Sequence, residues 1–263
     1  MIPITAFLFA LFSVLGCSRG NAEQERKAPN LLVVFPDELR LQAVGYHGTE
    51  PVETPNIDAF AEEGLVMTQA VSNYPLCSPF RGMFMTGKYS HRNNVVSNCN
   101  SARPENELLV SDTCWSDVLK AQGYDLGYIG KWHLDAPHAP FVNTYNNAPE
   151  RKTKWNEWCP PERRHGFDFW YSYGTYDRHM RPMYWTTNAP RDSFHYVDQW
   201  SPTHEADMAI RYLRNEDGQY RDSDRPFALV VSMNPPHTPY NQVPEKYLQR
   251  YHHLDADSLA ASL

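Results

Sequence analysis

The sequence has few cysteines, no excess of positive charge and no long apolar run, and each of these shortages excludes a class of protein. Five cysteines in 263 residues are too few for a disulfide-stabilised scaffold. Lysine and arginine number 24 against 31 acidic residues, a formal net charge of -7, so the basic face that nucleic-acid binding requires is missing. Only one apolar stretch approaches membrane length, which excludes a polytopic membrane protein.

The cysteines also lack the spacing of a structural zinc site, because the chain has no CxxC pair and no zinc-finger histidine spacing. Cys99, Cys114 and Cys159 leave room for one disulfide in an oxidising compartment, and the sequence does not choose the pair. What the chain does have is 41% hydrophobic residues and 21 prolines, the composition of a folded protein with many fixed turns.

The single apolar stretch lies at the amino terminus, from Ile2 to Gly16, and predicts a secretory signal over residues 1–17. Gly16-Cys17 after such a stretch resembles a bacterial lipoprotein signal, although the preceding residues include no Lys or Arg. An ordinary cleaved signal and a buried first helix are the alternatives. Residues 18–29 are polar and predict a tether. We expect an exported protein, periplasmic, secreted or lipid-anchored at the bacterial cell envelope, with that anchor as its one membrane contact.

Three apolar segments predict strands, at 30–35, 125–129 and 227–233. The first and last are continuous apolar runs, typical of strands buried on both faces. Residues suited to catalysis or metal binding follow directly after each segment. These residues are Asp37, Glu38, Lys131, His133 and His237.

Helical patterns alternate with these strands. They cover 54–64 with Thr54 as N-cap, a segment from Ser111 or Thr113 to Gly123, and about 203–215. The alternation predicts an α/β fold whose mostly parallel sheet is flanked by helices. Because ligands bind outside the carboxyl ends of such strands, the sequence predicts an active site at that edge.

A further segment, from Cys77 to Gly87, predicts a helix that Ser78 and Pro79 begin and Gly87 ends. Cys77 is then expected just before the helix amino terminus. The partial positive charge there, with Arg81 one turn on, favours an anionic group at position 77.

This segment resembles the signature C-x-P-x-R-x-x-x-x-T-G of the type I sulfatases. The fixed positions are matched by Cys77, Pro79, Arg81, Thr86 and Gly87. The resemblance extends to a second signature at Gly130–His133, to the family's metal pair at Asp37-Glu38 and to its histidine segment at Pro235–Tyr240. Together these motifs span residues 30–251 and imply the alkaline-phosphatase-like sulfatase core.

The resemblance implies a mechanism for cleaving sulfate esters. A maturation enzyme oxidises Cys77 to formylglycine, whose hydrate attacks sulfur with one hydroxyl and releases sulfate with the other. Asp37, Glu38 and residue 77 would hold one Ca²⁺, although Glu38 stands where the family more often has Asp or Gln.

The same resemblance assigns roles to the remaining residues. Arg81 and Lys131 are implied as catalytic cations, with Lys131 also binding substrate. His133 is expected to orient or deprotonate the nucleophile, and His237 to bind substrate or protonate the leaving group. Both histidines are expected to titrate near neutrality.

Two elements of the family are absent from the sequence, namely a later Asp–Asn or Asp–His pair that completes the metal shell and a smaller carboxyl-terminal domain. The expected organisation is therefore an incomplete amino-terminal catalytic domain over residues 30–263. Asp255 and Asp257 are substitute ligands that no predicted strand supports. Two alternatives stay open, a catalytically inactive sulfatase-like binding protein or fragment, and a phosphohydrolase of the same superfamily. The full Cys77 signature argues against the phosphohydrolase, which usually carries Ser or Thr.

Residues 136–202 are rich in proline and tryptophan and predict long loops above the strand ends. Five of the seven tryptophans lie here, and indole faces stack well on sugar rings. The predicted substrate is accordingly a sulfated small molecule or glycan, with a carbohydrate sulfate ester preferred. The alternative for each tryptophan is simple packing of the loops onto the domain.

Overall fold

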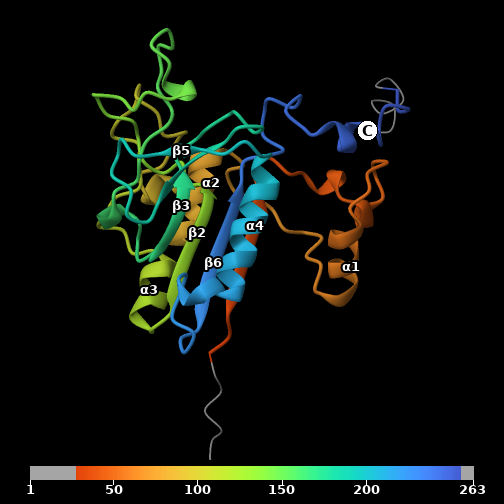
Figure 1. Ribbon diagram of the computed structural model, residues 1–263, viewed down its shortest axis with the longest axis horizontal. Coiled ribbons are helices and arrows are strands. Elements are labelled where there is room, and N and C mark those ends of the chain that lie inside the picture. Colours follow the sequence, from red (N-terminus) through yellow and green to blue (C-terminus); the bar gives the residue numbers. More distant parts are fainter. Residues whose placement is uncertain (1–27, 256–263) are drawn as a thin grey trace, which may run out of the picture.

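A six-stranded sheet forms the centre of the computed structural model, which describes residues 28–255 (Figure 1). The strands are Leu31–Pro36 (β1), Asp125–Lys131 (β2), Phe169–Tyr173 (β3), Met183–Thr186 (β4), His195–Tyr196 (β5) and Phe227–Met233 (β6). Their order across the sheet is β1-β6-β2-β3-β4-β5. β1, β6, β2 and β3 are mutually parallel, and β4 and β5 join antiparallel. The predicted α/β class with a mostly parallel sheet is confirmed.

The helices are Pro55–Glu63 (α1), Cys77–Thr86 (α2), Trp115–Ala121 (α3), Ser201–Arg214 (α4) and Glu245–Leu248 (α5). Short 3-10 helices lie at Leu41–Ala43, Gly45–His47, Ser90–Arg92, Tyr145–Asn147, Pro161–Arg163 and Glu216–Gly218. Two predicted helix starts were wrong. Cys77 is the first residue of α2 rather than the residue before it, and Cys114, not Ser111 or Thr113, caps α3.

Alternating side chains of the central strands separate two apolar clusters. Ala228 and Val230 of β6 belong to the cluster on the side of α2 and α3, whereas Leu229 and Val231 belong to the cluster on the side of α4. Figure 1 shows α4 lying over β6, with α2 behind the sheet. The sheet is therefore the middle layer of three, and both of its faces are covered at β2 and β6.

β1 departs from its prediction as a strand buried on both faces. It is the edge strand, and Leu32 and Val34 are 50% and 51% exposed. Phe35 packs against Phe80 and Phe84 of α2. On the opposite face, α4 packs against β6 and β2 and bonds to Tyr171 and Tyr173 of β3, away from β1. The apolar side chains of β1 therefore lie on both faces of the sheet. α2 covers one of these faces, and no described segment covers the other.

α1 is also less buried than its apolar stripe predicted. None of its residues is buried, and the Phe60 side chain is 77% exposed. Figure 1 shows α1 set apart from the sheet, beside the carboxyl-terminal segment. Glu53 joins the two, because its backbone N–H donates to Tyr251 Oη at 3.0 Å.

The tryptophan-rich region is more regular than its prediction as loops, because it contains β3, β4 and β5. Trp170 of β3 and Trp185 of β4 are fully buried, so these two tryptophans pack the core. Their strands were missed because the runs Phe169–Tyr173 and Met183–Thr186 are short and place aromatic residues consecutively, so they show neither alternation nor a long aliphatic run.

The predicted signal over residues 1–17 lies outside the described residues, as does most of the 18–29 tether. Within residues 28–255, no helix is both long and apolar enough to span a membrane. Cys77, Cys99, Cys114 and Cys159 are all free thiols, so the disulfide that the sequence left open does not form.

Candidate active site

The carboxyl ends of β1, β6 and β2 bring the predicted site segments together. Pro36 at the end of β1 pairs with Met233 at the end of β6, and the Asp37 N–H donates to the Met233 carbonyl at 2.8 Å. Lys131 ends β2, beside β6. The parallel register alone therefore places Asp37, Lys131 and the segment after Met233 at one edge, as predicted.

Cys77 lies at this edge as the first residue of α2. It is buried, and it lines two cavities, one of about 300 Å³ with His133 and His237 and one of about 220 Å³ with Asp37 and Glu38. Burial raises the pKa of its thiol, against the opposing effect of Lys131. An unmodified Cys77 is therefore a protonated thiol at neutral pH, a weak nucleophile in an otherwise electropositive position.

Lys131 and Asp37 form a buried ion pair next to Cys77. The Lys131 ammonium lies 2.5 Å from Asp37 Oδ2, 2.9 Å from Asn234 Oδ1 and 3.8 Å from Cys77 Sγ. Burial alone would raise the pKa of Asp37, but Lys131 and the neighbouring guanidinium of Arg81 hold it well below its usual range. The Asp37 carboxylate is consequently ionised throughout the physiological pH range.

Arg81 braces this pair from inside the fold. Its Nη1 donates to the Lys131 carbonyl and to Ser232 Oγ, both at 2.6 Å, and its Nη2 lies 3.3 Å from Asp37 Oδ2. The guanidinium also lies over the Phe35 ring, 5.1 Å from its centroid. Arg81 therefore links α2 to the ends of the neighbouring parallel strands β1, β6 and β2 and fixes both Asp37 and Lys131.

His133 is a buried, neutral imidazole. Burial lowers its pKa well below the ordinary range, and Lys131 and Arg81 lower it further, so the expectation of titration near neutrality fails for this residue. Its Nε2 lies 3.0 Å from the Cys99 carbonyl, which fixes the proton on Nε2. Its buried Nδ1 has no hydrogen-bond partner in the described chain and is left as a proton acceptor.

His237 lies between two carboxylates and lines the same cavity as Cys77. Its Nε2 is 3.6 Å from Glu38 Oε1, and its Nδ1 is 3.7 Å from Asp177 Oδ1. The Nδ1 also donates to the Thr238 carbonyl at 2.8 Å. The Thr238 carbonyl and the two carboxylates therefore hold the imidazole in place at the cavity wall.

The donor atoms available to a metal ion only partly match the predicted set. Asp37, Cys77 and His237 each present a ligand atom within 4.8 Å of the others, whereas Glu38 does not belong to this group. Asp255 does not belong to it either, and Asp257 lies outside the described residues. Calcium takes six to eight oxygen ligands, so the described residues supply only the beginning of a calcium shell.

Several cavity residues were not predicted from the sequence. Asp177 Oδ2 accepts from Asn146 Nδ2 at 2.6 Å, and Asn234 Nδ2 lies 3.4 Å from Asp177 Oδ1, so one polar network joins His237 to Lys131. The other lining residues that were not predicted are Asn98, Arg151 and Thr175, whereas Trp155 is one of the five tryptophans that the sequence offered for sugar stacking. Among the residues that were not predicted, only Asn234, which follows β6 directly, carried a usable signal, because the others lie in loops far from any motif.

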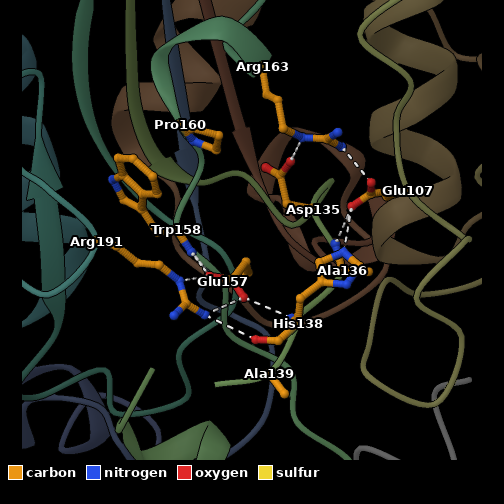
Figure 2. A pocket seen from close by; sticks show the side chains of 10 residues that line it. All are labelled: Glu107, Asp135, Ala136, His138, Ala139, Glu157, Trp158, Pro160, Arg163 and Arg191. Carbon is orange, nitrogen blue, oxygen red and sulfur yellow. Dashed lines mark hydrogen bonds and ion pairs between the residues drawn. The ribbon is translucent and has the colours of Figure 1, made fainter. Parts of the chain in front are cut away.

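A separate cavity of about 240 Å³ contains none of the predicted site residues. Figure 2 shows that its acidic and basic groups pair with one another: Arg163 reaches Asp135 and Glu107, and Arg191 reaches Glu157. Because these charges neutralise each other locally, the cavity offers a ligand little uncompensated charge. The Cys77 cavity is the better candidate.

The α/β fold and the motifs that meet at Cys77 are those of the sulfatase class of proteins. The Sulfatase family model matches residues 29–261, and the chain belongs to this family. Its members generally use a formylglycine residue and a metal ion.

Two curated relatives are named sulfatases. The chain is 42% identical to an endo-4-O-sulfatase of Bacteroides thetaiotaomicron over 95% of its own length and 51% of that protein. It is 32% identical to an ulvan-active sulfatase of Formosa agariphila, over 91% of this chain and 42% of the relative.

Solved structures of sulfatases are also similar to this chain. A sulfatase structure from Bacteroides fragilis superposes with a TM-score of 0.83 at 56% identity, covering 88% of this chain and 49% of that one. A 4S-sulfatase from a study of glycosaminoglycan metabolism in Bacteroides thetaiotaomicron superposes with a TM-score of 0.80 at 42% identity, covering 89% of this chain and 51% of that one. The chain thus spans about half the length of the relatives it matches.

Proposed function

We propose that this protein hydrolyses sulfate esters of carbohydrates, with residue 77 as the nucleophile after its conversion to formylglycine. The observation that carries the proposal is the position of Cys77, which starts α2 in a cavity shared with His133 and His237, 3.8 Å from the Lys131 ammonium. The relatives described above are named sulfatases, which favours sulfate over phosphate esters.

Hydrated formylglycine would supply one hydroxyl to attack sulfur and a second to release the sulfate. His133 Nδ1, which is neutral and has no other partner, accepts the proton of a hydroxyl on residue 77. Lys131 binds a sulfate oxygen and stabilises negative charge next to residue 77. Arg81 positions Lys131 and Asp37 through its buried hydrogen bonds, and its positive charge stabilises the Asp37 carboxylate at short range.

His237 is proposed as the donor to the leaving ester oxygen. It lines the same cavity as residue 77, and its ring nitrogens lie 3.6 and 3.7 Å from carboxylate oxygens of Glu38 and Asp177. The same carboxylates hold the ring in place, so that it binds substrate in one orientation.

We propose Ca²⁺ as the metal, held by Asp37 and by oxygen on residue 77, with Glu38 adjacent. Carboxylate oxygens are the ligands that this ion prefers, and Asp37 is ionised at all relevant pH values. The bound ion would supply positive charge to the sulfate oxygens. Further ligands are needed beyond those that residues 28–255 bring to the site.

The proposed substrate is a 4-O-sulfated glycan of the glycosaminoglycan type. The relative at 42% identity is named an endo-4-O-sulfatase, and Trp155 lines the Cys77 cavity, where its ring can stack on a sugar. Of the five tryptophans in residues 136–202, Trp155 is therefore the one we assign to substrate binding.

Two measurements test the proposal on the full chain coexpressed with a formylglycine-generating enzyme. Mass spectrometry of the residue-77 peptide should show the aldehyde or its hydrate. Release of sulfate from a 4-sulfated hexosamine should then depend on calcium and disappear in Cys77→Ala. Cys77→Ser keeps a hydroxyl but lacks the second one, so we expect a single turnover that stalls. Persistent free thiol under these conditions would refute the mechanism.

A second candidate, ligand binding without turnover, is favoured by one observation, the partial metal shell. It predicts that the correctly modified chain binds the sulfated sugar but releases no sulfate at any calcium concentration. Equilibrium binding and sulfate release measured on one preparation separate the two functions.

We also propose export, with Cys17 as a lipidation site. Metabolic labelling with a fatty acid in a bacterial host should mark the chain, and Cys17→Ser should abolish the label. A labelled Cys17→Ser variant would show that the acyl group is attached elsewhere.

A further inference from the structure

We propose that Arg151 forms a second anion-binding subsite in the Cys77 cavity, which binds an acidic group of the substrate other than the sulfate that is cleaved. The proposal deepens the proposed function, on which it rests: the substrate would be a glycan with a second anion close to its scissile sulfate. Arg151 and Cys77 line the same cavity of about 300 Å³, which is at the small end for ligand sites.

The loop that carries Arg151 is held in place. Lys154 Nζ donates to the carbonyls of Ala148 and Arg151, both at 2.6 Å, and lies 3.3 Å from that of Pro149. The Lys154 backbone is in turn tied to Ser101 by two hydrogen bonds of 2.8 and 3.0 Å. The guanidinium of Arg151 is therefore presented from a braced turn.

The charge of Arg151 is not neutralised by the protein. No carboxylate of the described chain forms an ion pair with Arg151 or with its neighbour Arg178, and both guanidinium groups lie over the Tyr145 ring, at 4.9 and 4.2 Å from its centroid. In contrast, Arg163 and Arg191 of the cavity in Figure 2 each reach acidic partners. Arg151 therefore brings a guanidinium without an ion-pair partner to the Cys77 cavity, where the lining carboxylate of Asp177 is engaged by Asn146 and Asn234.

The group that fits Arg151 is a planar or tetrahedral oxyanion, because the guanidinium fork matches carboxylate and sulfate oxygens. This second oxyanion is distinct from the sulfate that is cleaved, which the proposed function places against Lys131. In an acidic glycan the oxyanion could be the carboxylate of a neighbouring uronic acid or a second sulfate ester. Both present the same chemistry to Arg151, so a comparison of ligands must separate them.

The test measures dissociation constants by titration calorimetry on the full chain with Cys77 unmodified, so that nothing turns over. Four ligands are compared: a 4-sulfated hexosamine, the same sugar linked to a uronic acid, that disaccharide with its carboxyl reduced to an alcohol, and the hexosamine with a second sulfate. The variants are Arg151→Ala and Arg151→Lys. Arg214→Ala, at the far end of α4, is the control that removes an equal charge away from the cavity.

If the proposal is correct, a second anion strengthens binding about tenfold, and Arg151→Ala abolishes that gain while changing binding of the single-sulfate sugar less than about twofold. Arg151→Lys should restore part of the gain, and Arg214→Ala should change nothing. A gain with the uronate identifies the carboxylate, and a gain with the second sulfate identifies the sulfate. Equal weakening of all ligands by Arg151→Ala would overturn the subsite but not the proposed function.

Failure of every sulfated ligand to bind would instead overturn the proposed function. The subsite is then decided separately by titrating glucuronate and inorganic sulfate while the NMR signals of the arginine Nε–H groups are followed. The Arg151 signal is assigned by its loss in Arg151→Lys. A saturable shift of that signal supports the subsite, and an unmoved signal overturns it.

Discussion

Replacing Lys131 by Met should destabilise the fold because it leaves Asp37 as a buried carboxylate with only one cation. The Lys131 ammonium is fully buried and lies 2.5 Å from Asp37 Oδ2, and Arg81 remains 3.3 Å away in the variant. Breaking a buried pair costs roughly 3–5 kcal/mol, and the retained Arg81 places this case near 3 kcal/mol. For a chain of this size that loss lowers the melting temperature by roughly 6 to 12 °C.

Urea unfolding at pH 7 measures this loss, and Lys120→Met is its matched control. Lys120 also lies 2.5 Å from a carboxylate, that of Asp168, but both side chains are well exposed, so we expect less than about 1 kcal/mol there. A double-mutant cycle with Asp37→Asn isolates the pair. The double variant should be more stable than the sum of the single losses predicts, by about 1–3 kcal/mol.

The pH dependence gives an independent check. The pKa of Asp37 is lowered in the folded state, so its contribution is fully present above the pKa of the unfolded chain, about 4, and is lost as the pH falls further. The difference in stability between the wild type and Lys131→Met should therefore narrow below about pH 4. The reasoning would be refuted if the stability losses of Lys131→Met and Asp37→Asn were simply additive in the double variant. A difference of under about 0.5 kcal/mol between the wild type and Lys131→Met at pH 7 would also refute it.

Three further variants test other contacts. Ser78→Ala should cost about 1–3 kcal/mol in urea unfolding, because the buried Ser78 hydroxyl bonds the His133 carbonyl at 2.7 Å and the Cys99 N–H at 3.0 Å; an unchanged midpoint would contradict this. Glu205 is buried, which raises its pKa to about 8, so wild-type stability should fall between about pH 4.5 and 8, and Glu205→Gln should flatten that slope; equal slopes would argue against the assignment. Gly130→Ala should yield little soluble protein, since its Cβ would lie 2.1 Å from a backbone oxygen at a φ of +95°; a normal melting curve would disprove the clash.

The motifs could be placed together from the sequence because parallel strands bring their carboxyl ends to one edge whatever the loops do. Asp37, Lys131 and His237 could therefore be grouped from the sequence. The burial of each strand could not be predicted from the sequence, because it depends on which strands are neighbours in the sheet. β1 has an apolar run like that of β6 but lies at the edge.

The loop residues of the site were beyond sequence reasoning for a related cause. Arg151 and Asp177 reach the Cys77 cavity from loops that carry no periodicity, and the sequence offered Trp155 only as one of five tryptophans. The neutral state of His133 was also unpredictable, because complete burial beside two cations, and not its residue type, lowers its pKa.

The exposed face of β1 has a consequence for handling the protein. The strand pairs only with β6, so its outer N–H and C=O groups form no ladder with any described strand, and Leu32 and Val34 lie beside them. An open apolar edge of this kind is a template for intermolecular pairing. Along β1, amide hydrogen exchange should alternate between slow residues bonded to β6 and fast residues facing outward, and any self-association at high concentration should protect the fast ones first.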